Sequence, residues 1–329
     1  MTYFTDSLTL ESDLLKILGL VGESMNIEPS TPSASHILNP RGARWKYQRA
    51  WLRRFVVHKP LGAVGAGVVL LMFFLSAFGS FLTPYNPIDM DFMSKMQSPN
   101  LRHPLGTDLF GRDVLSNIIG GAKISIYVGF SSVIIGTGFG AVWGLTSGYA
   151  GGKFDMYSQR LIDILQSIPT LALALVIVAS LGSSLNNIII AISIGLIATS
   201  ARVVRASAIS IRGQDYIAAA ISTGAGWRRI VFRHVLPNTI PPYLVVATAG
   251  LGIAILQEAS LSFLGVGVPP PHPSWGRMLS GMGRDYLTIA PWLSLAPGIA
   301  IVVVVLAFNL VGDAFRDLFD PRLRGSERR

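Results

Sequence analysis

The residues of this chain that could carry out chemistry are few and far apart. The stretch from Gly148 to Lys153 is the part most similar to a phosphate-binding loop. However, Ser147 stands where the first glycine of G-x-x-x-x-G-K-[ST] should be, and Phe154 replaces the hydroxyl that would hold magnesium. The chain has no cysteine, and its five histidines are scattered without the spacing of metal ligands. We therefore expect no catalytic residue, no metal site and no cofactor in this chain.

The apolar residues are blocked into long segments that predict an all-α membrane protein. Half of the 329 residues are apolar and 14% are charged, and the mean hydropathy is +0.51, which a soluble domain of this size does not show. A membrane-spanning helix needs about 20 apolar residues. The uncharged run 164–201 is too long for one such helix, and its turn-rich cluster 182–187 divides it. The sequence predicts six spans, at 61–82, 124–148, 162–181, 188–206, 239–263 and 288–311.

The distribution of basic residues predicts the orientation of these spans. Most Lys and Arg residues lie in the segments 41–59, 149–161, 202–238 and 313–329. By the positive-inside bias, these segments and both termini are cytoplasmic. The net charge of +9 is thus a signal of topology. No basic domain is left over for nucleic acid. We expect a multi-pass protein of the cell's inner membrane.

Two acidic residues lie in predicted spans, where a charge is costly and often functional. Glu258 is the only acid of the fifth span and lies near its outer end, so we expect it to reach the membrane surface or to pair with an external arginine. Direct contact with a substrate is the alternative. Asp163 follows Arg160 by three positions, so the two can pair on one helix face, which favours a structural role. Both acids remain candidates for a transport pathway or gate.

The N-terminal residues differ in kind from the rest. Residues 1–44 lack the features of a signal peptide and include a Pro- and Ser-rich stretch, which predicts a partly flexible cytoplasmic extension. Residues 45–60 place aromatic and basic residues on opposite halves of a helix, as in a helix that lies on the membrane surface; a solvated basic tail is the alternative. We divide the remainder into a first span with an external loop (61–120), a core (121–312) that includes the polar loop 207–238, and a cytoplasmic tail (313–329).

The polar loop carries the most informative motif. Asp215 is expected to cap a helix that begins at Tyr216, and Gly224 is expected to end it. Pro237 is expected to close a second helical piece before the fifth span. The loop also offers small side chains over which a partner can approach, a large anchoring side chain and two cations that can pair with acids; these are Ala218, Ala219, Ala220, Trp227, Arg228 and Arg229.

The spacing of this loop resembles the cytoplasmic loop of permease subunits in binding-protein-dependent ABC importers. Other motifs are similar to the C-type permeases of dipeptide, oligopeptide, nickel and glutathione importers. These are His103–Ser116, Gly148–Asp155, Glu258–Gly267, Pro273–Gly276 and Asn309–Asp317, and the resemblance extends over about residues 45–324. One position departs from it, because Ala218 stands where many relatives carry a glutamate. Asp215, one turn earlier, could take over its ion pair.

The resemblance implies the six-helix fold of a type I ABC importer permease and a subunit that is not itself an enzyme. It implies a second, homologous permease, two ATP-binding subunits that hold ATP and magnesium, and an external substrate-binding protein as partners. The polar loop would then be the coupling loop to the ATPases. Di- or oligopeptides are the expected substrate, with nickel chelates, glutathione and oligosaccharides as alternatives. A secondary transporter or channel is the competing class, but it would show clusters of ionisable residues within its spans.

Overall fold

The computed structural model describes residues 59–281 and 285–319, all of which belong to one compact unit. The predicted extension 1–44, the surface helix 45–60 up to residue 58 and the tail beyond residue 319 lie outside these residues. Within them the chain is helical, and the only β-type pairing is an isolated bridge between Thr107 and Asp113. The predicted all-α class is confirmed.

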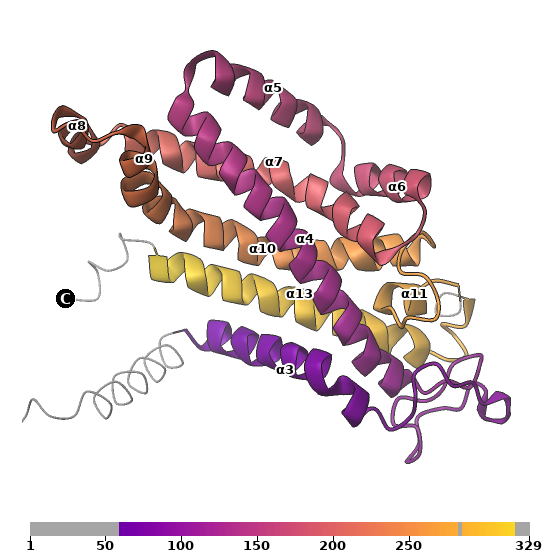
Figure 1. Ribbon diagram of the computed structural model, residues 1–329. Helices are drawn as coiled ribbons and strands as arrows, with labels where there is room; N and C mark the ends of the chain where they lie inside the picture. The colour runs from indigo at the N-terminus through magenta and orange to yellow at the C-terminus, as the bar shows by residue number, and fades with distance from the viewer. Residues whose placement is uncertain (1–58, 282–284, 320–329) are drawn as a thin grey trace, which may run out of the picture. The chain divides into compact units, whose positions relative to one another are not determined.

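Five long apolar helices match five of the predicted spans. They are α3 (Pro60–Leu82), α4 (Val114–Ala150), α7 (Leu185–Arg212), α10 (Leu236–Phe263) and α13 (Trp292–Phe319). Helix α4 begins ten residues before the predicted span because the Asp113 side chain accepts a hydrogen bond from the backbone N–H of Ser116 and caps it. Helices α3 and α13 lie side by side (Figure 1). An ion pair of 2.6 Å from Lys59 Nζ to Asp317 Oδ2 holds the start of α3 beside the end of α13.

The third predicted span, 162–181, is wrong as a single helix. The structure has two helices here, α5 (Gly152–Ser167) and α6 (Thr170–Leu181), which meet at an angle of 84°. The bend has a local cause, because a proline disfavours helical geometry at the residue before it. Ile168, which precedes Pro169, is extended. After α6 the chain turns at Gly182, and the Ser184 side chain caps α7, as the turn-rich cluster predicted.

Helices α4 and α7 meet through a row of glycines, which we call the α4–α7 seam. A Cβ atom added to Gly136, Gly140 or Gly144 would lie 2.4, 2.4 or 2.1 Å from a backbone carbonyl oxygen of α7. Since side chains cannot fit there, the two backbones touch along the seam and gain close van der Waals contact. The seam consists of Gly136, Gly140, Gly144 and Gly148 on α4 and of Ser193, Ile197, Ala201 and Arg205 on α7.

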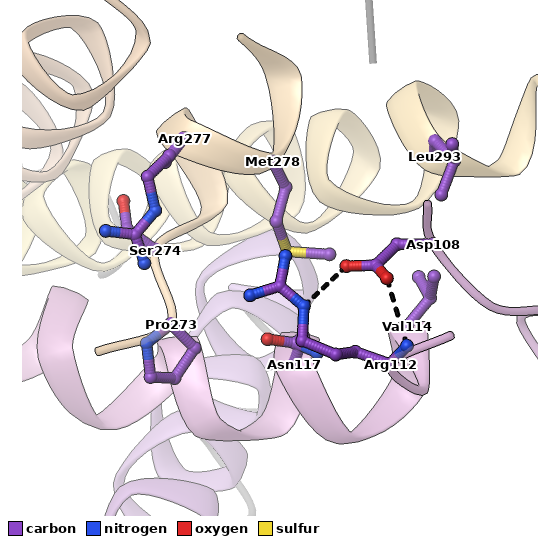
Figure 2. A pocket seen from close by; sticks show the side chains of 9 residues that line it. All are labelled: Asp108, Arg112, Val114, Asn117, Pro273, Ser274, Arg277, Met278 and Leu293. Atoms are coloured by element: carbon purple, nitrogen blue, oxygen red, sulfur yellow. Dashed lines mark hydrogen bonds and ion pairs between the residues drawn. The ribbon is translucent and has the colours of Figure 1, made fainter. Parts of the chain in front are cut away.

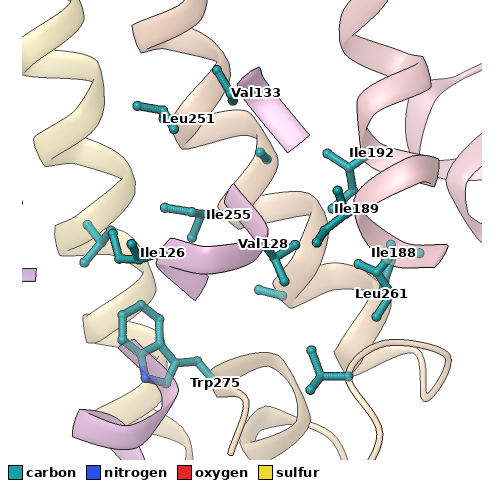
Figure 3. Close-up of a cluster of buried hydrophobic side chains, with 14 of the residues drawn as sticks. Ile126, Val128, Val133, Ile188, Ile189, Ile192, Leu251, Ile255, Leu261 and Trp275 are labelled. Carbon is teal, nitrogen blue, oxygen red and sulfur yellow. The ribbon is translucent and has the colours of Figure 1, made fainter. Parts of the chain in front are cut away.

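The largest buried apolar cluster joins α4, α7 and α10 (Figure 3). Ile126 and Val128 of α4 belong to the same cluster as Ile188 and Ile192 of α7. Trp275 of the short helix α11 (Trp275–Leu279) packs against Gly121 and donates from Nε1 to the carbonyl of Ile118 over 2.9 Å. The loop that follows α10 is thereby fixed to the start of α4.

Candidate functional site

The loop between α7 and α10 contains two short helices, α8 (Asp215–Ser222) and α9 (Trp227–Ile230). We call residues 215–232, which include both helices and the turn between them, the α8–α9 element. Helix α8 begins one residue earlier than expected. Asp215 is its first residue and not its cap, and the preceding Gln214 makes no capping bond with its side chain. The Asp215 carboxylate therefore lies in the first turn, where the helix dipole favours a negative charge.

Gly224 ends α8 as predicted. Its φ of +83° is in the left-handed region, which favours glycine. The Ala225 N–H donates to the carbonyl of Ala220 over 3.0 Å, and the Gly224 N–H donates to the carbonyl of Ile221 over 2.9 Å, so two carbonyls of the last turn are satisfied. No atom lies within 4 Å of the position that a Cβ would take. The glycine is therefore required by the backbone angle and not by crowding.

One side of the α8–α9 element is anchored and the other is exposed. Ile217 is fully buried, in a cluster with Val204 and Ala208 of α7. In contrast, Trp227 is 59% exposed and Phe232 is 64% exposed. Further exposed members are Tyr216, Ala218, Ala219, Ile221, Arg228 and Arg229. The Arg228 guanidinium lies 5.4 Å from the centre of the Trp227 ring, so the apolar surface carries a cation. An exposed apolar patch of this kind is a candidate interaction site.

Pro237 does not close a helical piece, so that prediction is wrong. The helix continues from α9 through a π-helical turn (Val231–Val235) into α10. Residues 227–263 together form one apolar helix that is long enough to span a membrane. Proline lacks an N–H and clashes with the carbonyl four residues before it. The wider π turn relieves this conflict; within it, the N–H of Leu236 donates to the carbonyl of Val231, five residues back. The loop between α7 and α10 is thus continuous with α10 through its second helix.

Glu258 does not reach the surface, and the expectation that it does so is wrong. Its side chain is fully buried, and no ion pair reaches it within residues 59–281 and 285–319. Three serine hydroxyls donate to the carboxylate instead. Ser262 and Ser274 donate to Oε1 over 2.9 and 3.0 Å, and Ser125 donates to Oε2 over 3.4 Å. The carboxylate therefore connects α4, α10 and the loop before α11.

Asp163 pairs with a different arginine from the one predicted. Its Oδ1 lies 2.8 Å from Nη2 of Arg202 on α7, and both side chains are half-exposed. A second pair between α5 and α7 was not predicted. Arg205 donates to both carboxylate oxygens of Asp155 over 2.6 Å, and these side chains are largely covered. Both pairs hold α5 against α7, which gives Asp163 a structural contact.

A small cavity of about 30 Å³, room for about one water, lies between the external loop and α11 (Figure 2). Arg112 and Arg277 both line it. Arg112 is paired with Asp108 over 2.7 Å, whereas Arg277 donates to the carbonyls of Val268 and His272. Burial, and next the charge of Arg112, lower the pKa of Arg277. Asp108 also accepts from the N–H groups of Phe110 and Arg112, so it orders the external loop and caps no helix.

No group of three His, Asp or Glu side chains that could hold a metal occurs in the part of the chain that the structure describes. The structure adds two features that the sequence reasoning missed. One is the α4–α7 seam, whose signal is the repeat of glycine every fourth residue from 136 to 148. The other is the polar contact between the buried Gln257 of α10 and the exposed Thr170 of α6 (2.9 Å), which carries no local sequence signal.

Comparison with known families matches residues 137–325, more than half of the chain, to the family described as binding-protein-dependent transport system inner membrane component. The chain belongs to this family. Residues 46–100 match the N-terminal transmembrane domain of oligopeptide transport permease C, which confirms the resemblance to C-type permeases. The chain is thus a permease of the ABC importer class.

Two relatives and one solved structure illustrate the similarity. The dipeptide transport system permease protein DppC of Alkalihalophilus pseudofirmus is 41% identical over 80% of this chain and 86% of the relative. The glutathione transport system permease protein GsiD of Escherichia coli is 38% identical over 89% of this chain and 96% of the relative. A structure of the MetNI methionine ABC transporter in an inward-facing conformation covers 62% of this chain and 95% of that chain, at 20% identity and a TM-score of 0.49.

Proposed function

We propose that this permease forms half of the membrane pathway through which an ATP-driven importer moves di- or oligopeptides into the cell. An external binding protein delivers the peptide, a second homologous permease completes the pathway, and two separate ATP-binding subunits hold ATP and magnesium and supply the energy. The observation that carries this proposal is the α8–α9 element, a rigidly anchored helix pair that presents exposed aromatic and basic side chains.

The anchoring explains how a force on the α8–α9 element would reach the membrane. Ile217 packs among residues of α7, and α9 continues into α10 without a break. A partner that shifts the element would therefore move two spanning helices together. We assign the element to the cytoplasmic side, with both termini, because the positive-inside bias places residues 202–238 there.

Peptides are the substrate that the relatives favour. The relative from Alkalihalophilus is named for dipeptide transport, and permeases named for peptide transport in Brucella are 40% identical to this chain. The run 164–201 has no charged residue, which suits a bulky polar solute better than a bare ion. Glutathione, the substrate in the name of the Escherichia relative, is itself a small peptide-like molecule and is the main alternative.

Co-purification and ATP hydrolysis test the assembly. A tagged chain expressed with its neighbours should bring down a second permease and ATP-binding subunits, and peptide-loaded binding protein should stimulate their ATP hydrolysis. The chain purified without partners should hydrolyse no ATP, and activity from it alone would refute the proposal. Mass spectrometry of the ligand carried by the cognate binding protein tests the substrate. A sugar or metal chelate there, with no peptide, would overturn the peptide assignment and leave the importer intact.

A further inference from the structure

The break between α5 and α6 leaves a helix N-terminus without a cap. Helix α6 begins at Thr170 after Pro169, which has no side-chain capping bond. In the described residues the backbone N–H groups of Thr170, Leu171 and Ala172 have no acceptor, and Thr170 is exposed. Inside a membrane such groups must find partners in protein or water-filled space. The partial positive charge of the helix start adds to the demand for an oxygen acceptor.

This N-terminus lies at mid-depth among the spanning helices. Thr170 packs beside Gly195, near the middle of the 28-residue α7, where a Cβ would lie 3.3 Å from the Cβ of Thr170. Gln257 of α10 donates from Nε2 to Oγ1 of Thr170 over 2.9 Å. The free donors are therefore far from both ends of α7, so lipid head groups would not satisfy them and their acceptor must come from a water-filled pathway or a ligand.

A second and independent observation points to a ligand. Gln257 is only 8% exposed, and its Oε1 has no hydrogen-bond partner in residues 59–281 and 285–319. Its other amide atom faces the start of α6. Exchanging the two amide atoms would not remove the conflict, because the buried Nε2 would then have two unpaired hydrogens. A buried acceptor without a partner is costly, so a ligand that donates a hydrogen bond to Gln257 Oε1 would be favoured.

The donors of α6 and the acceptor on Gln257 thus stand side by side. The run from Ile164 to Ala201 has no charged residue, and the carboxylate of Glu258, next to Gln257 on α10, is already held by three serine hydroxyls. A peptide main chain supplies the complementary groups, an oxygen that accepts and an N–H that donates. We propose that the α5–α6 break is a binding subsite for the main chain of the transported peptide. The N–H groups of α6 and the Thr170 hydroxyl bind a carbonyl or terminal carboxylate oxygen, and Gln257 Oε1 accepts an N–H after its amide turns toward the ligand.

This subsite recognises the part that all peptides share, so it holds peptides irrespective of their side chains. The inference rests on the proposed function, because it assumes that peptides pass along this face of the permease. It also assigns a purpose to the bend at Pro169, since a straight helix would bond these N–H groups internally and offer none to a ligand.

The chain has no native cysteine, so single cysteines can report on the subsite directly. Ser167→Cys lies at the break, where the native hydroxyl is exposed and bonds only to Ile164 in its own helix. Ser180→Cys is the matched control at the other end of α6, also exposed and bonded only to Val176 in its own helix. Each variant is assembled as the complete importer in proteoliposomes with binding protein and is treated with a water-soluble thiol reagent.

We expect the reagent to label Ser167→Cys, and a tripeptide with its binding protein and ATP to suppress that labelling while labelling of Ser180→Cys is unchanged. A C-terminally amidated tripeptide distinguishes the two oxygen sources: suppression by the free acid alone indicates the carboxylate, and suppression by both indicates a carbonyl. Added Thr170→Val should abolish the protection, whereas Thr170→Ser should retain it, in complexes that co-purify normally. No labelling of Ser167→Cys, or labelling that peptide does not suppress, overturns the subsite.

Uptake of radiolabelled peptide by the wild-type vesicles distinguishes a failure of the subsite from a failure of the proposed peptide substrate. If the vesicles take up peptide and Ser167→Cys is not protected, the subsite is wrong and the importer stands. If they take up no peptide, the proposed substrate fails and the subsite fails with it.

Discussion

The α4–α7 seam and the α8–α9 element both involve α7, yet they are built on opposite principles. Along the seam, glycines bring two backbones into direct contact and leave no room for a methyl group. In the α8–α9 element, Gly224 and Gly226 have nothing within 4 Å of where a Cβ would lie, and large side chains are exposed. The seam is formed within this chain, whereas the element leaves large side chains uncovered.

The comparison teaches that the same residue type serves different ends. A seam glycine is needed for space, and its replacement should damage the fold. Gly224 is needed for its backbone angle, and its replacement should damage the connection to a partner while the membrane fold persists. Stability and coupling can therefore be separated by choice of glycine, and each glycine has a matched control in its own region.

The largest effect is expected at the seam. In Gly144→Ala the new Cβ would lie 2.1 Å from the carbonyl oxygen of Ala201, so the helices must separate and lose contact along several turns. We expect destabilisation of about 3 kcal/mol or more and little monodisperse protein after extraction in detergent. Gly138→Ala on the same helix is the control, since nothing lies within 4 Å of its Cβ position. Equal yields and melting temperatures for the two variants would show that the seam is not closely packed.

A smaller effect on stability, but a large one on coupling, is expected at Gly224. Gly224→Val forces a β-branched residue to adopt a φ of +83°, which costs about 1–2 kcal/mol, or moves the turn after α8. Gly226→Val is the control, because its φ of −68° suits any residue. We expect Gly224→Val to insert into the membrane but to lose ATPase co-purification or stimulation. Normal transport by this variant would contradict a coupling role for the loop.

The sequence predicted those features that depend on one segment alone. Apolar length marks a span wherever its neighbours lie, and the left-handed conformation at Gly224 follows from the chemistry of helix ends. Features that depend on distant partners could not be predicted. Asp163 was assigned to Arg160 on its own helix, but the structure offers Arg202 at closer range; Glu258 is held by Ser125, which is 133 positions away.

The two errors that involve prolines show the same limit. Pro169 breaks a predicted span, because the residue before it is extended, and the bend exposes the start of α6. Pro237 was expected to end a helix, but a π-helical turn accommodates it. The local sequence presents a similar obstacle in both places. Tertiary packing of Ile230 and Val235 against the end of α7 favours a continuous helix at the second.

The smallest effect concerns the two ion pairs that hold α5 beside the seam. Arg205 closes the seam through its backbone, which faces Gly148, and its side chain binds both oxygens of Asp155. Asp163 and Arg202 form the exposed counterpart one turn away on α7. We expect Asp155→Asn to destabilise the protein by about 1 kcal/mol, because the bidentate pair is largely covered, and Asp163→Asn to change stability by less than about 0.5 kcal/mol.

Thermal unfolding in detergent at low and high salt measures both. The Asp163 contribution should vanish in high salt, because solvent ions screen an exposed pair, while that of Asp155 should largely remain. Equal losses from the two substitutions would mean that α5 is held by charge alone, and that burial beside the seam adds nothing to the strength of the Asp155 pair.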